Sequence, residues 1–414
     1  MRKKLALCIP TYNRGENIEQ LLQSLPGMDN ENFAVYIFDS SEDEKTKILV
    51  ENYARKHIYY ELVEGVEYSN QKVFRIYERM ADSEADYVWL MNDHSIFDRD
   101  ALEFIFKALE EDGDFYLLDV RCPEFSVTDF AGLDDFLVRS AWQLTYWGAS
   151  IVKRETFLKG VDWSLMDRKY LVPETMEYSQ LGFYFERSSQ LPDVKLKQIG
   201  LLRDCMMDRM RYEKPAWHKE KFRICTQCWH EVIMRLPDVY KVRTETLKSM
   251  DSWYLSKFSL MELKEDGAYG LGHFLRYGKY LSEIAPERYR EAFLIAMLPL
   301  CVCRQLLTGN LLRMIKSARQ EQRKIYVYGA GRHGVDCTNY LESCGIIHDG
   351  FLVTDLVGNP QCIRDYPVYA SEEKLEAGIL VILAFLSEGK SSVEMKLETL
   401  RENGMDIKYM AFNA

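Results

Sequence analysis

Short apolar runs alternate with helical patterns over the first hundred residues, and this alternation limits the fold more than any other feature of the sequence. Four apolar runs have the length of strands and lie at residues 5–9, 34–38, 58–63 and 87–91. Residues 16–25 and 68–80 carry apolar side chains at three- and four-residue spacing, as helices packed on a sheet do. Strands joined by helices predict parallel βαβ units and therefore an α/β fold.

Polar or turn-forming residues follow each of the four expected strands. They are Pro10-Thr11-Tyr12-Asn13, Asp39-Ser40-Ser41, Gly65 and Asn92-Asp93-His94-Ser95. In an open parallel sheet, ligands bind outside the carboxyl ends of the strands. The sequence therefore predicts that these groups meet at one edge of the sheet.

The chain beyond residue 114 is expected to complete this sheet, which would then be mixed, and afterwards to become helical. Strands are expected at residues 115–120 and 147–152, and a helix at about residues 173–187. A chain of 414 residues is too long for one hydrophobic core. The expected regions are an α/β domain at residues 1–214, a mostly helical region at 215–322 and a third domain at 323–414.

The third domain is predicted to be small, doubly wound and Rossmann-like. A strand at residues 325–328 leads through a glycine-rich turn into a helix, and further strands are expected at 351–354, 380–384 and 407–410. Gly329, Gly331 and Gly334 have the spacing of a dinucleotide-binding fingerprint, and Asp355 lies 21 residues after Gly334, near the place of a ribose-binding acid. A tight strand-to-helix turn explains the same glycines. We favour the turn, because no partner domain with hydride-transfer groups is visible in the sequence.

The charge of the chain restricts its ligands. The formal net charge of −11 argues against a general nucleic-acid binder, because binding to a phosphate backbone needs clustered positive charge. Apolar residues make up 47% of the chain and charged residues 28%, which is the balance of a folded protein. The ligand should therefore be a smaller molecule.

The apolar segments are short, and we expect a cytoplasmic protein. The first apolar run breaks at Pro10, so it is interpreted as a strand instead of a signal peptide. The longest run, residues 293–303, contains Pro299 and falls below the roughly 20 residues that span a bilayer. Residues 304–324 hold six basic side chains and one acid among several leucines. That pattern suits either a helix lying on the inner face of an anionic membrane or a helix packed between two domains.

Three ordered segments, CIPTYNRGENIEQLLQSL, VYIFDSSED and DYVWLMNDHSIF, resemble family 2 glycosyltransferases of the GT-A fold. The resemblance spans roughly residues 4–190. Together with the C-terminal domain, the chain resembles the members of this family that act in bacterial surface-polysaccharide synthesis. It implies an inverting enzyme of the hexosyltransferase type. Such an enzyme would move a sugar from a nucleotide-diphosphate donor, here expected to be UDP-linked, to a hydroxyl of a cell-surface glycan or a lipid-linked precursor. It could contact a membrane peripherally or form a homo-oligomer.

The resemblance also implies a set of donor-binding residues. These are Pro10, Thr11, Tyr12, Asp39, Asn70, Lys72, Asn92 and Asp93. Asp39 would accept a hydrogen bond from the imide N–H of uracil, and Lys72 would neutralise diphosphate charge. A turn-capping carboxylate at Asp39 and a solvated lysine on a helix face explain the same two residues without a ligand.

The segment Asn92-Asp93-His94-Ser95 stands where the family carries its acidic metal-binding motif. A divalent cation, Mn²⁺ or Mg²⁺, would stabilise charge on the leaving diphosphate and prefers hard oxygen ligands. The candidate ligands are Asp93, Ser95 and His218. His94 and Ser95 replace the usual acids, which leaves three options open. Asp93 and weaker neighbours hold the metal, cationic groups hold the diphosphate without a metal, or catalysis is lost.

Inversion requires a base that takes the proton of the acceptor hydroxyl. Glu177 in the segment PETMEYSQLGFYFER matches the position of that base, and Glu174 could share a helix face with it. A carboxylate in the first turn of a helix is the alternative role for both. Thr145, Trp147 and Gly148 are candidates for acceptor contact, and core packing explains them as well.

Two other functions fit the sequence. A non-catalytic sugar-nucleotide-binding or scaffold protein would account for the altered metal motif. An NAD-linked oxidoreductase would work through the C-terminal glycine pattern.

Overall fold

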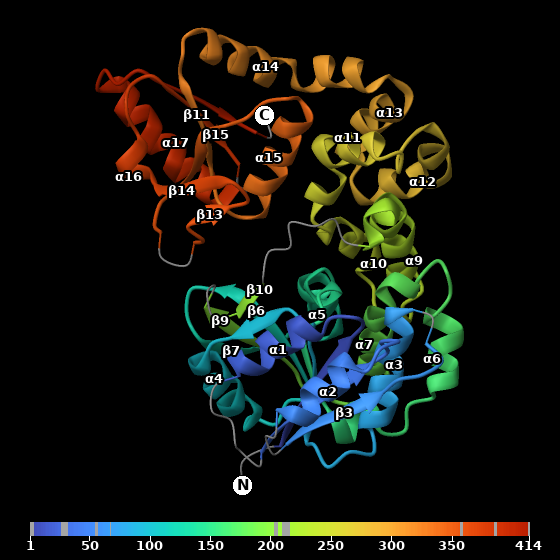
Figure 1. Ribbon diagram of the computed structural model, residues 1–414. Helices are drawn as coiled ribbons and strands as arrows, with labels where there is room; N and C mark the ends of the chain where they lie inside the picture. The colour runs from blue at the N-terminus through green and yellow to red at the C-terminus, as the bar shows by residue number, and fades with distance from the viewer. Residues whose placement is uncertain are drawn as a thin grey trace. The chain divides into compact units, whose positions relative to one another are not determined.

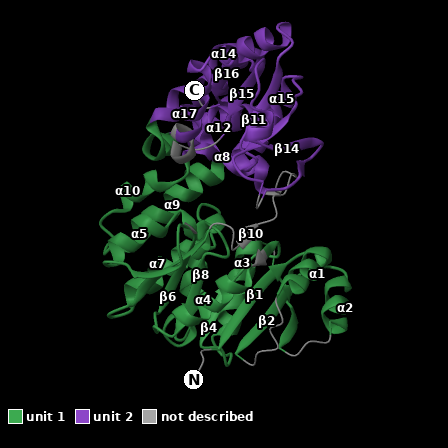
Figure 2. Ribbon diagram, turned by 90° about the vertical axis from the view of Figure 1, so that its left-hand side faces the viewer, with its two compact units in different colours: residues 1–209, 223–251, 279–286 green, residues 210–222, 252–278, 287–414 purple. Residues whose placement is uncertain are grey.

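A computed structural model describes residues 4–25, 32–53, 57–66, 68–202, 206–208, 216–356, 359–384 and 387–412. The chain divides into two compact units (Figure 2). Unit 1 comprises residues 1–209, 223–251 and 279–286, and unit 2 comprises residues 210–222, 252–278 and 287–414. Residues 215–322, which the sequence presents as one helical region, contribute segments to both units.

Unit 1 is built on an eight-stranded sheet with the order β3-β2-β1-β4-β8-β6-β9-β7. Its strands are β1 (Leu5–Thr11), β2 (Phe33–Asp39), β3 (Ile58–Leu62), β4 (Tyr87–Leu90), β6 (Phe115–Cys122), β7 (Ser126–Asp129), β8 (Ser150–Lys153) and β9 (Leu196–Leu202). The first four strands are parallel, as predicted, whereas β8 runs antiparallel to both β4 and β6. The expectation of an α/β fold with a mixed sheet is confirmed.

Helices of unit 1 include α1 (Gly15–Ser24), α2 (Lys45–Asn52), α3 (Ser69–Met80), α4 (Arg99–Leu109), α5 (Leu133–Ser140), α6 (Trp163–Tyr170), α7 (Ser179–Gln190), α9 (Trp229–Met234) and α10 (Arg243–Thr246) (Figure 1). Of these, α6 and α9 pack on α7, and α10 packs on α5. Alternate residues of β1, Leu5, Leu7 and Ile9, belong to one core cluster with residues of α1 and α4. Elsewhere α3 packs against α7, where the hydroxyl oxygens of Tyr77 and Tyr184 lie 2.6 Å apart. All seven residues of β1 are buried, so helices cover both faces of the strand, and the alternating direction of its side chains places Leu5, Leu7 and Ile9 on the face of α1 and α4.

A short antiparallel ribbon adds to unit 1. Its strands are β5 (Ser95–Phe97) and β10 (Met206–Asp208), with Asp208 opposite Ser95. Because β5 begins within the segment Asn92-Asp93-His94-Ser95, this pairing ties the end of that segment to the chain after β9.

Unit 2 contains helices followed by a second sheet. The helices are α11 (Lys257–Glu265), α12 (Leu271–Ile284, of which residues 279–284 are grouped with unit 1), α13 (Tyr289–Met297), α14 (Leu300–Gln320), α15 (Arg332–Ser343), α16 (Ser371–Lys374) and α17 (Ser387–Glu402). The strands are β11 (Lys324–Tyr328), β12 (Gly350–Val353), β13 (Cys362–Ile363), β14 (Tyr366–Ala370), β15 (Ile379–Leu383) and β16 (Ile407–Ala411). A second, C-terminal sheet is thereby confirmed.

The second sheet has the order β13-β14-β12-β11-β15-β16. All neighbouring strands are parallel except the pair β13 and β14. The strand order reverses at β11, so the carboxyl end of that strand is the topological switch point where doubly wound sheets bind ligands.

The long basic helix predicted around residues 304–324 is α14, and its apolar side is used for packing within unit 2. Leu311, Ile315 and Ala318 are buried, at three- and four-residue spacing, and the helix contacts α11, α13, β11 and β15. Leu306 near its start is 62% exposed. In the part of the chain that the structure describes, no helix is both long enough and apolar enough to pass through a bilayer.

Candidate active site

The ends of the early parallel strands bring three polar segments together, as the sequence predicted for strands of one direction. In the register of β1 and β2, Thr11 lies beside Asp39. The backbone N–H of Ser40 donates to the carbonyl of Thr11 at 3.2 Å, and the N–H of Met91 donates to the carbonyl of Cys8 at 2.9 Å. The segments after β1, β2 and β4 therefore share one edge of the sheet.

Asp39 is fully buried at this edge and holds the turn that follows β2. Its Oδ1 accepts hydrogen bonds from the Ser41 backbone N–H at 2.9 Å and from the Ser41 hydroxyl at 2.5 Å. Its Oδ2 accepts a hydrogen bond from the Tyr60 hydroxyl at 3.2 Å. Burial, with the neighbouring Asp39 charge, raises the pKa of Tyr60 to about 12. The turn-capping role considered for Asp39 is thus present, and the carboxylate stays beside the other polar groups.

Asp93, in the segment that follows β4, is only 2% exposed. Its carboxylate accepts hydrogen bonds from the Thr11 hydroxyl at 3.1 Å and from Arg14 Nη1 at 3.2 Å, and His94 Nδ1 lies 3.2 Å from Oδ1. Burial raises the pKa of Asp93, but the hydrogen bond with His94 and the charge of Arg14 outweigh it and hold the pKa below its ordinary value.

Lys72 joins the two carboxylates into one site. It projects from the first turn of α3, is only 4% exposed, and its Nζ donates to the carbonyl of Thr11 at 2.7 Å. Burial lowers the pKa of Lys72 to about 8, and the charges of Asp39 and Asp93 offset part of that effect. Because Thr11 is in register with Asp39 and hydrogen-bonds both Lys72 and Asp93, the two carboxylates and the amine belong to a single polar site.

The start of α3 offers further groups to a ligand. Its N-cap, Tyr68, makes no side-chain hydrogen bond to the helix, and its first turn contains no acidic residue among those described. Asn70 is 5% exposed, and among the described residues its Oδ1 has no hydrogen-bond partner. A buried acceptor without a partner is costly, and helix N-termini attract negative charge. Tyr12 and Tyr68, on the two neighbouring segments, are both about half exposed.

The motif segment after β4 does not offer the ligand set of a divalent cation. Asn92 accepts a hydrogen bond from the Ser95 hydroxyl at 2.8 Å, and that hydroxyl also lies 2.7 Å from the Tyr146 hydroxyl. Asp93 is then the single carboxylate of the segment, and it is already paired with Arg14. Magnesium and manganese sites need several hard oxygen ligands. The positive charge of this site comes from Arg14 and Lys72.

His218, the third candidate metal ligand, has acidic neighbours of its own in unit 2. It is 7% exposed, and its Nε2 lies 2.8 Å from Asp266 Oδ2. Glu262 on α11 joins them, and the potential ligand atoms of the three residues lie within 4.8 Å of one another. One imidazole and two carboxylates can hold a divalent cation. The sequence analysis did not identify either acid.

The structure corrects the setting of Glu174 and Glu177. The helix expected from residue 173 begins only at Ser179, so the two carboxylates do not share a helix face. Glu177 lies in a single 3₁₀ turn, Met176–Tyr178, which packs against α3. Arg223 Nη2 lies 3.6 Å from Glu177 Oε1, and Arg235 Nη2 lies 3.7 Å from Glu174 Oε2. Glu177 is therefore the carboxylate next to the helix that carries Lys72.

The acceptor candidates lie beside the segment after β4. Tyr146 reaches Ser95, and the carbonyl of Gly148 accepts a hydrogen bond from Trp89 Nε1 at 2.9 Å. A Cβ at Gly148 would come within 2.6 Å of the Tyr146 ring, so glycine lets that ring pack against the backbone. The strand expected from residue 147 begins at Ser150 as a result.

Two other acceptor candidates flank this glycine. The carbonyl of Thr145 accepts a hydrogen bond from Gln180 of α7 at 3.4 Å, and Trp147 is half-buried. These three positions thus form one short segment between α5 and β8.

The C-terminal glycines serve a close strand-to-helix turn. Gly329 has a φ of +111°, and a Cβ at Gly334 would lie 1.9 Å from the carbonyl oxygen of Gly329. Gly331 is the N-cap of α15, where a Cβ would meet no described atom within 4 Å. Asp355 follows β12 and is exposed.

Side chains from residues 252–255 cover the first turn of α15. Trp253 Nε1 donates to Asp336 Oδ2 at 2.7 Å, and the Trp253 ring packs on His333 with centroids 4.4 Å apart. The Arg332 guanidinium lies over the Tyr254 ring, 4.2 Å from its centre. Side chains of residues 253 and 254 thus contact those of Arg332, His333 and Asp336 on the first turns of this helix.

Sequence reasoning missed several members of the site in unit 1. They are Arg14, Tyr60 and Arg223. Arg14 directly follows the segment after β1, so a cation next to a predicted anion site was a usable signal. For the others, only the folded chain brings the hydroxyl or guanidinium to its partner.

Comparisons with known proteins bear on the first part of the chain. Residues 6–162 match the model of the family described as Glycosyl transferase family 2, which is less than half of the chain. The comparison with curated proteins gives no match.

Solved structures with detectable similarity include three proteins. S. aureus TarS has 12% sequence identity and a TM-score of 0.39, covering 70% of this chain and 90% of that one. The mannosyltransferase of Pyrobaculum calidifontis in complex with GDP-Man and Mn²⁺ has 14% identity and a TM-score of 0.39, covering 75% and 88%. Glucosyl-3-phosphoglycerate synthase of Mycobacterium tuberculosis in complex with Mn²⁺, UDP and phosphoglyceric acid has 15% identity and a TM-score of 0.38, covering 57% and 80%.

Proposed function

We propose that unit 1 is an inverting glycosyltransferase of the GT-A fold, which binds a UDP-sugar and transfers the sugar to a hydroxyl. One observation carries the proposal. Thr11, which is in register with Asp39, donates its hydroxyl to Asp93 and accepts the buried amine of Lys72 on its carbonyl. The match of residues 6–162 to Glycosyl transferase family 2 supports the same function.

Asp39 would recognise the base of the donor. A carboxylate has about four acceptor sites on its two oxygens. Three are used, by the Ser41 backbone, the Ser41 hydroxyl and the Tyr60 hydroxyl. The remaining acceptor site would take the imide N–H of uracil. The three existing bonds hold the carboxylate in place before the donor arrives, so less ordering is needed on binding.

The diphosphate would lie beside Lys72 and Arg14. Lys72 is buried with its amine at the sheet edge, whereas the Arg14 side chain is 46% exposed and can turn from Asp93 to a ligand. Two cations and the N-terminus of α3 would stabilise the negative charge that grows on the leaving diphosphate. In this proposal the protein's own cations supply the charge that a divalent metal supplies elsewhere.

Glu177 would be the general base. It would take the proton of the acceptor hydroxyl while the hydroxyl oxygen bonds to the anomeric carbon. The bond from that carbon to the diphosphate oxygen breaks in the same step, and UDP leaves with the electron pair. Arg223, 3.6 Å from Glu177, would orient the carboxylate. Attack from the face opposite the leaving group inverts the anomeric centre.

The acceptor would approach over Thr145, Trp147 and Gly148, next to the segment after β4. We expect a hydroxyl of a cell-surface glycan or of its lipid-linked precursor. Unit 2 would contribute a Rossmann-like domain whose glycines serve its fold. The tight turn accounts for Gly329 and Gly334 without a dinucleotide, so we favour the transferase over NAD-dependent oxidation.

Isothermal titration calorimetry with UDP, GDP and NAD tests the proposal. UDP should bind to the full chain, and Asp39→Asn should weaken it by about tenfold or more, as expected for a hydrogen bond to a charged group. Asp43→Asn is a matched control, because Asp43 follows the same strand but is exposed and pairs with Lys45.

Equal UDP affinity in the Asp39→Asn and wild-type proteins would contradict the assignment of the base-binding residue. Binding of NAD alone would replace the transferase with the oxidoreductase. A UDP-release assay across a panel of UDP-sugars separates the enzyme from a non-catalytic sugar-nucleotide binder, which would bind UDP without turnover.

A further inference from the structure

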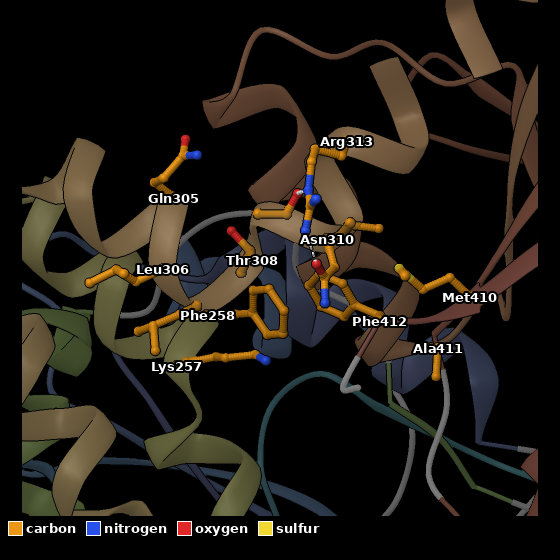
Figure 3. A pocket seen from close by; sticks show the side chains of 13 residues that line it. Lys257, Phe258, Gln305, Leu306, Thr308, Asn310, Arg313, Met410, Ala411 and Phe412 are labelled. Atoms are coloured by element: carbon orange, nitrogen blue, oxygen red, sulfur yellow. Dashed lines mark hydrogen bonds between the residues drawn. The ribbon is translucent and has the colours of Figure 1, made fainter. Parts of the chain in front are cut away.

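A cavity of about 440 Å³ lies within unit 2, and none of the three glycines of the turn lines it (Figure 3). The middle of α14, the start of α11 and the end of β16 enclose it. Its volume is in the range of sites for small molecules. It adjoins Met410, Ala411 and Phe412 at the carboxyl end of β16, which is the side of a parallel sheet that receives ligands.

The lining of this cavity is positively charged. Among its lining residues, Lys257 and Arg313 are cationic and none is acidic, although the chain as a whole has a net charge of −11. Figure 3 shows the rings of Phe258 and Phe412 between these two cations. Burial lowers the pKa of Lys257; the charge of Glu291, which does not line the cavity, opposes this, and that of Arg288 adds to it. An anion in the cavity would favour the charged amine again.

The helix α14, which forms the main wall of the cavity, contains residues of low helix propensity where it lines the cavity. Thr308, Gly309 and Asn310 are three consecutive weak helix formers in the middle of the 21-residue helix α14, and all three line the cavity. A Cβ built at Gly309 would meet no described atom within 4 Å outside its own stretch of helix. Packing therefore does not require glycine there. Local rules are commonly broken where a ligand must approach closely.

Arg313 is held in position over this weak turn. Its guanidinium donates to Asn310 Oδ1, and its Nε lies 3.4 Å from the carbonyl oxygen of Gly309. Figure 3 shows the side chain lying back along α14 toward Asn310. A guanidinium fixed in this way can bind a phosphate group with little further ordering.

We propose that this cavity binds a phosphate-bearing small molecule between Lys257 and Arg313, with the uncharged part of the ligand against Phe258 and Phe412. The two rings are stacked, with centroids 3.8 Å apart and 21° between their planes, and present an apolar face. Leu306, 62% exposed, adjoins the cavity. The phosphate could belong to a free metabolite or to a lipid headgroup, and the experiment below distinguishes the two.

Two measurements on the full chain test the proposal. Calorimetry with glycerol 3-phosphate reports binding of a free phosphate ester. Co-sedimentation with phosphatidylcholine vesicles, with and without phosphatidylglycerol, reports binding of a lipid headgroup. Binding in either assay should weaken about tenfold or more in Arg313→Gln and in Lys257→Gln.

Three further variants locate the site. Lys316→Gln removes an exposed cation from α14 that does not line the cavity and should bind as the wild type does. Lys72→Met in unit 1 should leave this binding unchanged. Gly309→Ala should raise the melting temperature, and Gly309→Leu should block binding while the chain remains folded.

Binding of glycerol 3-phosphate without vesicle binding identifies a free metabolite, and the reverse identifies a lipid headgroup. The proposal is overturned if neither probe binds, or if Arg313→Gln and Lys257→Gln bind as the wild type does. Equal losses in Lys316→Gln and Arg313→Gln would also overturn it, because they would show attraction by the net charge of the helix and no defined pocket.

Discussion

Donor binding should depend on pH through Lys72. Its amine is buried among the groups that face it, which are Asp39 at the end of β2, Asp93 after β4, Arg14 before α1 and the carbonyl of Thr11. Burial places its pKa at about 8, so the charge that the donor diphosphate requires is lost within an accessible pH range.

The expected change in affinity follows from the fraction of charged amine. With a pKa of about 8, about nine tenths of Lys72 is protonated at pH 7 and about one tenth at pH 9. A diphosphate that binds only the charged form should therefore bind about tenfold more weakly at pH 9.

The free energy of unfolding should instead increase as pH rises, whereas donor affinity decreases. The unfolded lysine keeps its proton up to a pKa of about 10.4, whereas the folded one loses it near 8. Between these values the unfolded chain binds more protons, so the free energy of unfolding rises with pH. The Lys72 term thus destabilises the fold below pH 8, and this effect is relieved as pH increases.

Calorimetry with UDP at pH 7 and pH 9 measures the binding effect. Lys72→Arg keeps a positive charge at both values and should bind equally at both, whereas Lys72→Met should bind weakly at both. Any titration of UDP itself appears in all three proteins. A wild-type affinity that is unchanged between pH 7 and pH 9, or a loss of the same size in Lys72→Arg, would refute the role given to this amine.

Three further outcomes are expected. Glu177→Gln should slow sugar transfer by about 10² to 10⁴-fold with UDP affinity unchanged, whereas Glu174→Gln should change the rate little. Steady-state rates with saturating donor measure both effects. Equal losses of rate in the two variants would contradict Glu177 as the base. Asp93→Asn should strengthen UDP binding, with or without a chelator, because it releases the arginine that the carboxylate holds. If calorimetry shows that the variant binds UDP more weakly, and that Mn²⁺ strengthens UDP binding only in the wild type, Asp93 is a metal ligand. Gly334→Ala should lower the free energy of unfolding by about 1–3 kcal/mol, since its Cβ would lie 1.9 Å from a carbonyl oxygen. Gly331→Ala should lower it by less than about 1 kcal/mol. Similar melting curves for the two variants would contradict this packing account.

The early strands of unit 1 could be predicted from the sequence because their signal is local. Apolar runs bounded by turn residues gave β1 to β4 within a few residues of their observed bounds. The rule that parallel strands end at one edge then placed Thr11, Asp39 and Asp93 near one another. The structure adds the link through Lys72, since the pattern of α3 left open whether this lysine points to the site or to solvent.

The strand β14 was missed because its sequence argues against a strand. It reads Tyr-Pro-Val-Tyr-Ala, and Pro367 removes one backbone donor. The strand nevertheless pairs with β12 on one side and with the two-residue β13 on the other. Tertiary pairing here outweighs a local signal, which no reading of the segment alone could show.

The late start of α7 has a similar cause. Pro173 followed by two glutamates resembles the first turn of a helix. In the structure the Thr175 hydroxyl donates instead to the carbonyl of Tyr170 at 2.9 Å, and Arg223 donates to the carbonyl of Pro173 at 3.0 Å. These distant contacts hold an irregular segment, which turns Glu177 toward Arg223 and separates it from Glu174.

The altered motif after β4 becomes intelligible when the charges of the site are counted together. Asp39 and Asp93 contribute two negative charges, and Lys72 and Arg14 contribute two positive ones, so the site is balanced before any donor binds. A diphosphate adds negative charge to this balance. Under the proposed function, the segment after β4 supplies no second acid for a metal, so Arg14, the half-exposed member of the four, would leave Asp93 for the ligand while Thr11 and His94 keep the carboxylate bonded. Under the proposed function, the donor and Asp93 would therefore compete for one guanidinium, and the buried Lys72 would supply the charge that does not depend on this competition.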